Sequence, residues 1–473
     1  MFRRLGFAFS ARRNVATMAT PTSIPSEPLL VILGSTGTGK SELAVELATR
    51  FRGEIINADA MQLYNGLPII TNKITVPEQK GIPHHLLGHI SLHEMPWDVD
   101  DYTRQAKKTI QEIRSRGNLP IVVGGTQYYV DPLIFKEVTL GDLYSNETVT
   151  FPILDEPTEV ILAELRKVDP AMASRWHPND RRKIQRSLEI YLRSGKPASE
   201  FYAEQQERKA TLISNLEQSP WENLMFWVYS DREVLKTRLD GRVEKMLDTG
   251  LLDEVRECHE FKRGREAAGF KVDMTRGIWQ SIGYRQFEPY LDAACRGEDA
   301  STLEELKATA LEDMKVATRR YANYQNRWTR LKQFPLLVEQ GPEAVDSLYL
   351  LDSSDVSHYK DNVVEPAAAI TAQFLKGEQR PHPVDISQLA REVLSTAREP
   401  PPKAVPCERT CEICGTVATT EEMWRRHVRG ASHKRAMKKR KRLALVPVDQ
   451  PGDGSEDPTS ERSSSPELGS IFS

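Results

Sequence analysis

The chain has 473 residues, of which 39% are hydrophobic and 28% are charged, and its formal net charge is −3. This composition is typical of a folded protein of two or three domains. It contains no apolar stretch long enough to cross a bilayer, and its small net charge does not by itself indicate a polyanionic partner. Its five cysteines are too few for a disulfide framework in a chain of this length.

Residues 1–27 have the composition of a targeting segment. They contain four arginines and no acid before Glu27, which is the profile of a mitochondrial presequence. An unstructured basic tail is the alternative. Met18 offers a second start that would give a form without the presequence, so we expect the protein in the mitochondrion and in the cytoplasm.

Residues 34–41 form the most informative motif. They follow an apolar run at 29–33 and have the spacing of a phosphate-binding loop between a strand and a helix. The glycines let backbone N–H groups face phosphate oxygens, Lys40 adds positive charge, and the Ser41 hydroxyl is suited to ligate Mg²⁺. The residues expected to bind phosphate are Gly34, Ser35, Thr36, Gly37, Thr38, Gly39, Lys40 and Ser41.

Residues 28–150 alternate apolar runs with amphipathic stretches, which predicts the first part of a parallel α/β core. The expected elements are strands at 29–33, 54–58 and 119–123 and helices from Ser41 and over 101–116. Asp59 and Gly124-Gly125-Thr126 follow two of these strands, at the edge where open α/β sheets bind ligands. Three roles are open for Asp59: Mg²⁺ ligand, general base, or helix N-cap.

The rest of the chain divides by composition. Residues 151–215 are charged and helical in pattern, which predicts a helical insertion on the α/β core. The α/β core is expected to continue over 216–340, with a strand at 221–230 and long helices at 231–257 and 302–332. Residues 341–405 are richer in proline and acids and predict a linker with a short helix. A small Cys/His module with a basic run (406–442) and a disordered tail (443–473) are expected to follow.

The order of the motifs resembles the tRNA dimethylallyltransferase family. The loop is followed by Asn57-Ala58-Asp59-Ala60-Met61-Gln62-Leu63-Tyr64, then by related motifs at 82–86, 122–126, 177–180, 282–285 and 318–322. The resemblance spans residues 28–333. It implies transfer of a dimethylallyl group from its diphosphate to N6 of the adenosine beside the tRNA anticodon, position 37. The phosphate loop would then hold a diphosphate leaving group rather than a nucleotide.

The resemblance also implies roles for single residues. Asp59 would be the general base that accepts the N6 proton, and Thr36 would contact the diphosphate. Mg²⁺ would accompany the donor, the partners would be tRNA and dimethylallyl diphosphate, and we expect a monomer. The tRNA contacts carried over are Asp59, Ala60, Met61, Gln62, Thr126, Arg182, Lys183, Ile184, Gln185, Arg186, Gln280, Arg285 and Gln325.

Two positions depart from the family pattern. Ser35 stands where bacterial loops carry proline, a change of small consequence. Gln280 stands where bacterial members carry an arginine that contacts the diphosphate, and an uncharged amide cannot supply that charge. Arg285, Arg242 and Lys73 are unranked substitutes.

Two other functions use the same features. A small-molecule kinase or ATPase would place ATP on the loop, and an RNA-binding protein would retain the loop without turnover. The reaction product discriminates among the three.

The module near the C-terminus has the spacing of a Cys₂His₂ finger. Cys411 and Cys414 are separated by two residues, and His427 and His433 by five, with twelve residues between the pairs. Two thiolates and two imidazoles favour tetrahedral Zn²⁺, which leaves Cys407 spare. The module resembles that of eukaryotic family members.

A basic run over residues 434–442 follows the finger. Such a run suits the tRNA backbone or nuclear import, so the nucleus is a third candidate compartment.

Overall fold

The computed structural model describes residues 23–135, 151–204, 221–270, 272–274, 276–397 and 405–444. Most of the presequence-like segment 1–27 and of the expected tail 443–473 therefore lies outside the described residues. None of the helices in the described ranges combines the length and apolarity needed to span a bilayer.

Parallel strands form the core sheet, in the order β3-β2-β4-β1-β5-β6. The strands are β1 (Pro28–Gly34), β2 (Gly53–Asn57), β3 (His84–His85), β4 (Leu119–Val123), β5 (Glu222–Tyr229) and β6 (Leu348–Asp352). The side chains of the central strand β1 point alternately to the two faces of the sheet. Val31 and Leu33 pack in the core on one face, and Leu30 and Ile32 pack in the core on the other. This is the period of two that a strand buried on both faces requires.

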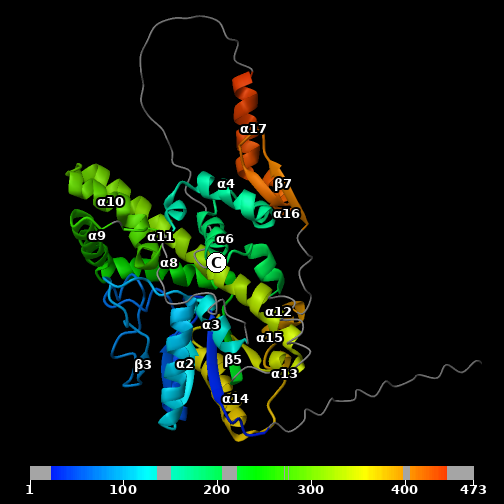
Figure 1. The fold of residues 1–473 in the computed structure, drawn as a ribbon. Helices are drawn as coiled ribbons and strands as arrows, with labels where there is room; N and C mark the ends of the chain where they lie inside the picture. Colours follow the sequence, from blue (N-terminus) through cyan, green and yellow to red (C-terminus); the bar gives the residue numbers. More distant parts are fainter. Residues whose placement is uncertain are drawn as a thin grey trace, which may run out of the picture.

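Helices cover both faces of this sheet (Figure 1). α1 (Lys40–Phe51) and α14 (Glu365–Lys376) supply side chains to one core, and α2 (Val99–Ser115) and α3 (Gln127–Ile134) to the other. The predicted parallel α/β core is confirmed, because each element expected before residue 124 forms within a few residues of its predicted bounds.

The helices between residues 150 and 330 lie above the sheet in Figure 1, and the shorter ones after residue 333 lie beside it. They are α4 (Thr158–Val168), α5 (Pro170–Arg175), α6 (Arg181–Ser194), α8 (Arg232–Asp248), α9 (Leu251–Ala267), α10 (Tyr284–Arg296), α11 (Ala300–Trp328), α12 (Phe334–Gln340), α13 (Pro342–Val345) and α15 (Gln388–Ala397). α4, α5 and α6 enclose a small core of their own. The helix expected over 231–257 is two helices, because Gly250 takes a left-handed conformation (φ 108°) between α8 and α9.

The segment expected to be a linker, 341–405, is largely folded. β6 pairs with β5 as an edge strand of the sheet, and α14, α15 and a π-helical turn (Lys360–Val364) follow. The prediction was wrong because the apolar run of β6 is only four residues long and stands in a stretch rich in proline and acids. A buried parallel strand this short has no periodicity that distinguishes it from a loop.

The small C-terminal module contains two antiparallel strands and two helices. They are β7 (Pro406–Thr410), β8 (Val417–Thr420), α16 (Glu421–Arg429) and α17 (Ala431–Ala444). In Figure 1 the strands and α16 are drawn at the height of α4 and α6 and α17 rises above them, at the opposite end of the molecule from the sheet.

Candidate functional site

A cavity opens at the carboxyl edge of the sheet, beside the ends of β1 and β2. Its wall combines the phosphate loop, the segment after β2, and side chains from α8, α11 and the turn before α10. The lining residues are Thr36, Asp59, Met61, Gln62, Ile70, Thr71, Asn72, Arg242, Met246, Gln280, Ser281, Ile282, Met314, Thr318 and Tyr321. Five of the predicted site residues therefore meet here: Thr36, Asp59, Met61, Gln62 and Gln280.

Opposite charges converge beside the loop. Arg242 donates from Nη1 to Oγ1 of Thr36 at 2.9 Å, and its buried Nε has no hydrogen-bond partner among the described residues. Lys40 and Arg242 both lie close enough to Asp59 for their charges to interact. Two cations facing one carboxylate leave positive charge that an anion can neutralise. Of the three substitutes for the bacterial arginine, Arg242 is the one that contacts the loop.

Burial changes the acidity of these groups. It raises the pKa of Asp59, against the opposing effects of the Met61 N–H, which donates to Oδ1 at 3.0 Å, and of Lys40. It lowers the pKa of Lys40 to about 8 and that of Arg242 to about 10, although Asp59 attracts both charges. Asp59 is thus a stronger base than an exposed aspartate. Turns rather than a helix follow it, so the helix N-cap role is wrong.

Gln325 of α11 lies between the phosphate loop and the end of β4. Its Oε1 accepts from the Thr36 N–H at 2.8 Å, and its Nε2 donates to the Gly125 carbonyl at 2.9 Å. A Cβ at position 125 would lie 2.0 Å from Nε2, so the close approach requires glycine. Gln325 is only 1% exposed. Its predicted contact with tRNA stays a prediction, while its hydrogen bonds support the loop.

The structure distributes the other predicted tRNA contacts unevenly. Thr126 is buried, and its Oγ1 accepts from the Ala60 N–H at 3.0 Å, which fixes the segment that carries Asp59. Ile184 is fully buried in the core of α4–α6, so its side chain is not available to tRNA. Arg285 is exposed on α10 and does not line the cavity.

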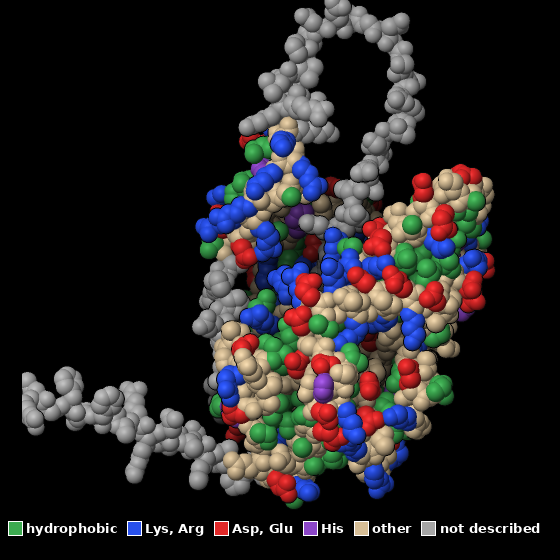
Figure 2. All heavy atoms as spheres, turned by 180° about the vertical axis from the view of Figure 1, so that it is seen from behind, with side chains coloured by type: hydrophobic (Ala, Val, Ile, Leu, Met, Phe, Trp, Pro, Cys, Tyr) green, Lys and Arg blue, Asp and Glu red, His purple; other side chains and the backbone are tan. Residues whose placement is uncertain are grey.

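The arginines at the start of α6 form a positive group. Arg182 lies close enough to Arg186 and Arg276 for their charges to interact. Lys183 pairs with Asp180 at 3.0 Å, and Gln185 donates to the Leu154 carbonyl at 3.2 Å. Figure 2 shows lysine and arginine side chains gathered in a hollow below the C-terminal module. A hollow with this charge suits a phosphate backbone.

The sequence predicted Arg242 as one of three unranked substitutes for the bacterial arginine but missed Arg238 as a contact of the loop. Arg238 and Arg242 of α8 both reach it, Arg238 by donating to the Gly37 carbonyl at 2.9 Å. Their i, i+4 spacing places them on one helix face, which was a usable signal. Tyr321 of α11, which interacts with Thr126 and Gln325, gave no such signal.

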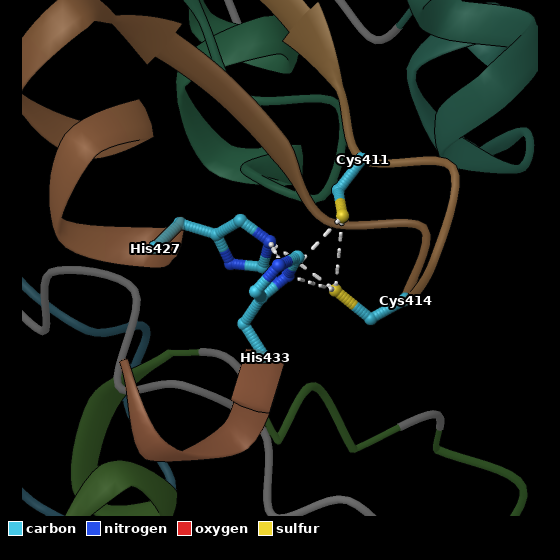
Figure 3. Close-up of side chains that lie close together, drawn as sticks. All are labelled: Cys411, Cys414, His427 and His433. Carbon is cyan, nitrogen blue, oxygen red and sulfur yellow. Dashed lines mark hydrogen bonds between the residues drawn. The ribbon is translucent and has the colours of Figure 1, made fainter. Parts of the chain in front are cut away.

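The four predicted metal ligands come together in the C-terminal module (Figure 3). Sγ of Cys411 lies 3.4 Å from Sγ of Cys414 and 3.5 Å from Nδ1 of His433, and Nε2 of His427 lies 3.2 Å from Sγ of Cys414 and 3.1 Å from Nδ1 of His433. All four donor atoms lie within 4.8 Å of one another. A tetrahedral ion with ligand bonds of about 2.0–2.3 Å needs separations of about 3.3–3.8 Å, so the four residues can hold one metal ion.

Comparison with known proteins gives three findings. The family model described as IPP transferase matches residues 62–332. The chain is 36% identical to a tRNA dimethylallyltransferase of Schizosaccharomyces pombe (88% of this chain, 96% of that one) and 36% identical to that of Homo sapiens (88% and 87%). A solved structure of a eukaryotic dimethylallyltransferase acting on tRNA superimposes with a TM-score of 0.70 at 34% identity, covering 89% of this chain and 98% of the other.

The lowered pKa of Lys40 predicts how anion binding depends on pH. In the free protein the ammonium is present below about pH 8 and is lost as the pH rises through that value. The affinity of the wild-type protein for Mg²⁺-diphosphate, relative to that of Lys40→Met, should therefore shrink above pH 8. Calorimetry from pH 6.5 to 9.5 measures both affinities, and their ratio cancels the ionisation of the ligand.

Lys73 is the control for this experiment. Burial also lowers its pKa to about 8, and its charge interacts with Glu254 and with Asp59. Its ammonium contacts Gly66 and Thr71, however, and it does not line the cavity. Lys73→Met should keep the alkaline fall in affinity. If the affinity of Lys73→Met for Mg²⁺-diphosphate no longer falls above pH 8 and that of Lys40→Met still does, the loss of affinity comes from deprotonation of Lys73.

Proposed function

The chain belongs to the IPP transferase family, and we propose that it transfers a dimethylallyl group from dimethylallyl diphosphate to N6 of the adenosine at position 37 of tRNA, giving N6-isopentenyladenosine. One observation carries the proposal: a single cavity joins the phosphate loop to Asp59 and to an apolar wall. The loop and Arg242 suit the diphosphate, and Ile70, Met246 and Met314 suit the dimethylallyl chain.

The proposed reaction uses each of these groups. N6 of adenosine attacks C1 of the dimethylallyl group, the C–O bond to the diphosphate breaks, and the N6 proton passes to Asp59. Negative charge develops on the leaving diphosphate, where the Lys40 and Arg242 charges and the N–H groups of the loop stabilise it. The raised pKa of Asp59 makes this carboxylate a better acceptor of the proton. The adenine must leave its stack to bring N6 into the cavity.

Two metal ions belong to the proposal. Mg²⁺ would be held by the Ser41 hydroxyl and by oxygens of the diphosphate, and would neutralise part of the leaving group's charge. Ser41 is exposed in the first turn of α1 and does not line the cavity, so its role rests on the loop motif. Zn²⁺ would fill the Cys₂His₂ cluster, since two thiolates and two imidazoles are its preferred tetrahedral set.

Contacts on the far side of the loop weigh against a nucleotide kinase. The side chains of Leu235, Leu239 and Tyr359 pack against Gly37 and Gly39, and none of the three lines the cavity. A group attached to a diphosphate on this loop would extend into the cavity instead, toward its wall of Ile70, Met246 and Met314. A dimethylallyl chain suits that wall, whereas the hydroxyls of a ribose would lose hydrogen bonds to water there.

Several finer assignments are part of the same proposal. The remaining tRNA contacts lie on α6, α10 and the basic helix α17, and the chain acts as a monomer. Residues 1–27 direct it to the mitochondrion, the form starting at Met18 stays in the cytoplasm, and the basic run adds nuclear import. A fusion of residues 1–30 to a fluorescent protein that stays out of mitochondria would refute the targeting role.

The product tests the function directly. With dimethylallyl diphosphate, Mg²⁺ and unmodified tRNA, the protein should add the mass of one dimethylallyl group to an adenosine beside the anticodon, as nucleoside mass spectrometry detects. ATP hydrolysis without prenylated tRNA would support the kinase function instead. Binding of tRNA with neither turnover would support an RNA-binding protein.

Asp59→Asn tests the general base. The amide cannot accept the N6 proton, so turnover should fall about 10²-fold or more while tRNA affinity is largely retained. Single-turnover rates and a filter-binding titration measure the two effects. Asp240→Asn is the control, because Asp240 pairs with Arg319 and does not line the cavity. Turnover of Asp59→Asn within twofold of wild type would remove Asp59 from this role.

Cys414→Ser tests the zinc site. Loss of one thiolate should release about one zinc ion per chain and should weaken tRNA binding more than the chemical step. Elemental mass spectrometry and tRNA titration measure the two effects. Cys407→Ser is the matched control and should keep its zinc, because the Cys407 thiol contacts the Ala418 carbonyl and is not among the four ligands. Equal zinc loss in both variants would contradict the predicted ligand set.

A further inference from the structure

The chain segment after β6 is linked to the phosphate loop by hydrogen bonds that the carbonyl groups of the loop accept. Tyr359 donates its hydroxyl proton to the Gly39 carbonyl at 2.8 Å. Arg238 donates to the Gly37 carbonyl and, from its other terminal nitrogen, to the Ser353 carbonyl, each at 2.9 Å. Two carbonyls of the loop are thus tied to residues 353–359, which follow it by more than 300 positions in the chain.

The ring of Tyr359 also covers Gly39 closely. A Cβ built at Gly39, whose φ is 91°, would lie 2.7–2.8 Å from Cε2, Cζ and the hydroxyl oxygen of the ring. Tyr359 is 8% exposed and belongs to the core that α1 and α14 share. The ring therefore fits only against a glycine in this conformation, and it holds the loop where α1 begins.

The same part of the chain also contacts the C-terminal end of α1. Glu365, at the start of α14, pairs with Arg50 in the last turn of α1 through two hydrogen bonds of 2.8 and 2.9 Å. Tyr359 and Glu365 thus contact opposite ends of one helix. Both residues lie beyond residue 332, where the match to the family model ends.

Peptide geometry turns these carbonyl contacts into control of the binding groups. In a planar trans peptide the C=O of one residue and the N–H of the next point in opposite directions. The Gly39 carbonyl accepts from the Leu43 N–H of α1 at 3.1 Å as well as from Tyr359, and fixing it there directs the Lys40 N–H the opposite way. Fixing the Gly37 carbonyl toward Arg238 does the same for the Thr38 N–H. These N–H groups are the ones with which such a loop binds phosphate oxygens.

We infer that Tyr359 is a positioning residue for the donor: it fixes the phosphate loop in its diphosphate-binding conformation through the Gly39 carbonyl, with Arg238 as its counterpart at Gly37. The identity of the donor in this inference rests on the proposed function. Tyr359 does not line the cavity, so it does not touch the reacting atoms. A loop that is already ordered loses less entropy when the anion binds, and the donor binds more tightly in proportion.

Tyr359→Phe tests the inference, since it keeps the ring over Gly39 and removes only the hydroxyl. Its affinity for Mg²⁺-diphosphate should fall about three- to tenfold, the effect expected for one hydrogen bond. The KM for dimethylallyl diphosphate should rise by a similar factor, with kcat and the KM for tRNA within twofold of wild type. Tyr359→Leu, which also removes the ring, should give a larger rise.

Tyr349→Phe is the matched control. Tyr349 of β6 is also buried, and its hydroxyl donates to the Pro381 carbonyl at 2.9 Å, away from the loop. Both variants lose one hydrogen bond from a tyrosine to a carbonyl, so similar losses in melting temperature are expected, but only Tyr359→Phe should weaken diphosphate binding. Equal affinities for Mg²⁺-diphosphate in the two variants would overturn the inference.

The binding measurement separates this inference from the proposed function. If the wild-type chain binds Mg²⁺-diphosphate but yields no prenylated tRNA, the proposed function fails. A selective loss of binding in Tyr359→Phe would then still support the positioning role. If the wild-type chain prenylates tRNA and Tyr359→Phe matches it in diphosphate affinity and in donor KM, the positioning role fails and the function stands.

Discussion

The site depends on a small group of half-buried charges at the edge of the sheet. Lys40, Arg242 and Asp59 are half-buried, so their charges interact more strongly than in bulk water, and the partial loss of hydration shifts the pKa of each group. One carboxylate cannot offset two cations, so the site retains positive charge and free donors, among them Nε of Arg242. Binding a diphosphate neutralises that excess, and the surrounding fold serves to keep the three charges in place.

Each member of the group is delivered by a different part of the chain. The end of β1 supplies the loop, the end of β2 supplies Asp59, and α8 supplies Arg242. α11 then ties the loop to the end of β4 through Gln325. Because these ties are hydrogen bonds to backbone groups, the loop keeps its conformation without a ligand, and less free energy is lost in ordering it when the ligand binds.

The sequence predicts the parts of this arrangement that are local. The loop motif, the strands before it and after α1, and the Cys₂His₂ spacing each occupy a short window, and all of them form as expected. The contacts of Arg242 and Gln325 join residues separated by more than 200 positions. No periodicity shows which face of a helix meets a loop so distant in the chain. The prediction missed β6 for a related reason. This segment forms a strand because it pairs with β5, and its own sequence pattern does not indicate one.

The same reasoning explains why a loop motif common to nucleotide sites leads here to another ligand. The backbone cradle recognises only the phosphates, so selectivity must come from what lies next to it. On one side Tyr359, Leu235 and Leu239 pack against the loop glycines, and on the other the cavity offers methionine and isoleucine side chains. Methionine is unbranched and adapts its shape to a small apolar group, whereas it offers a ribose no strong hydrogen bonds. The cavity side chains next to the loop therefore carry the proposed selectivity for a prenyl diphosphate, and one of them, Met314, lies far along the chain from the motif itself.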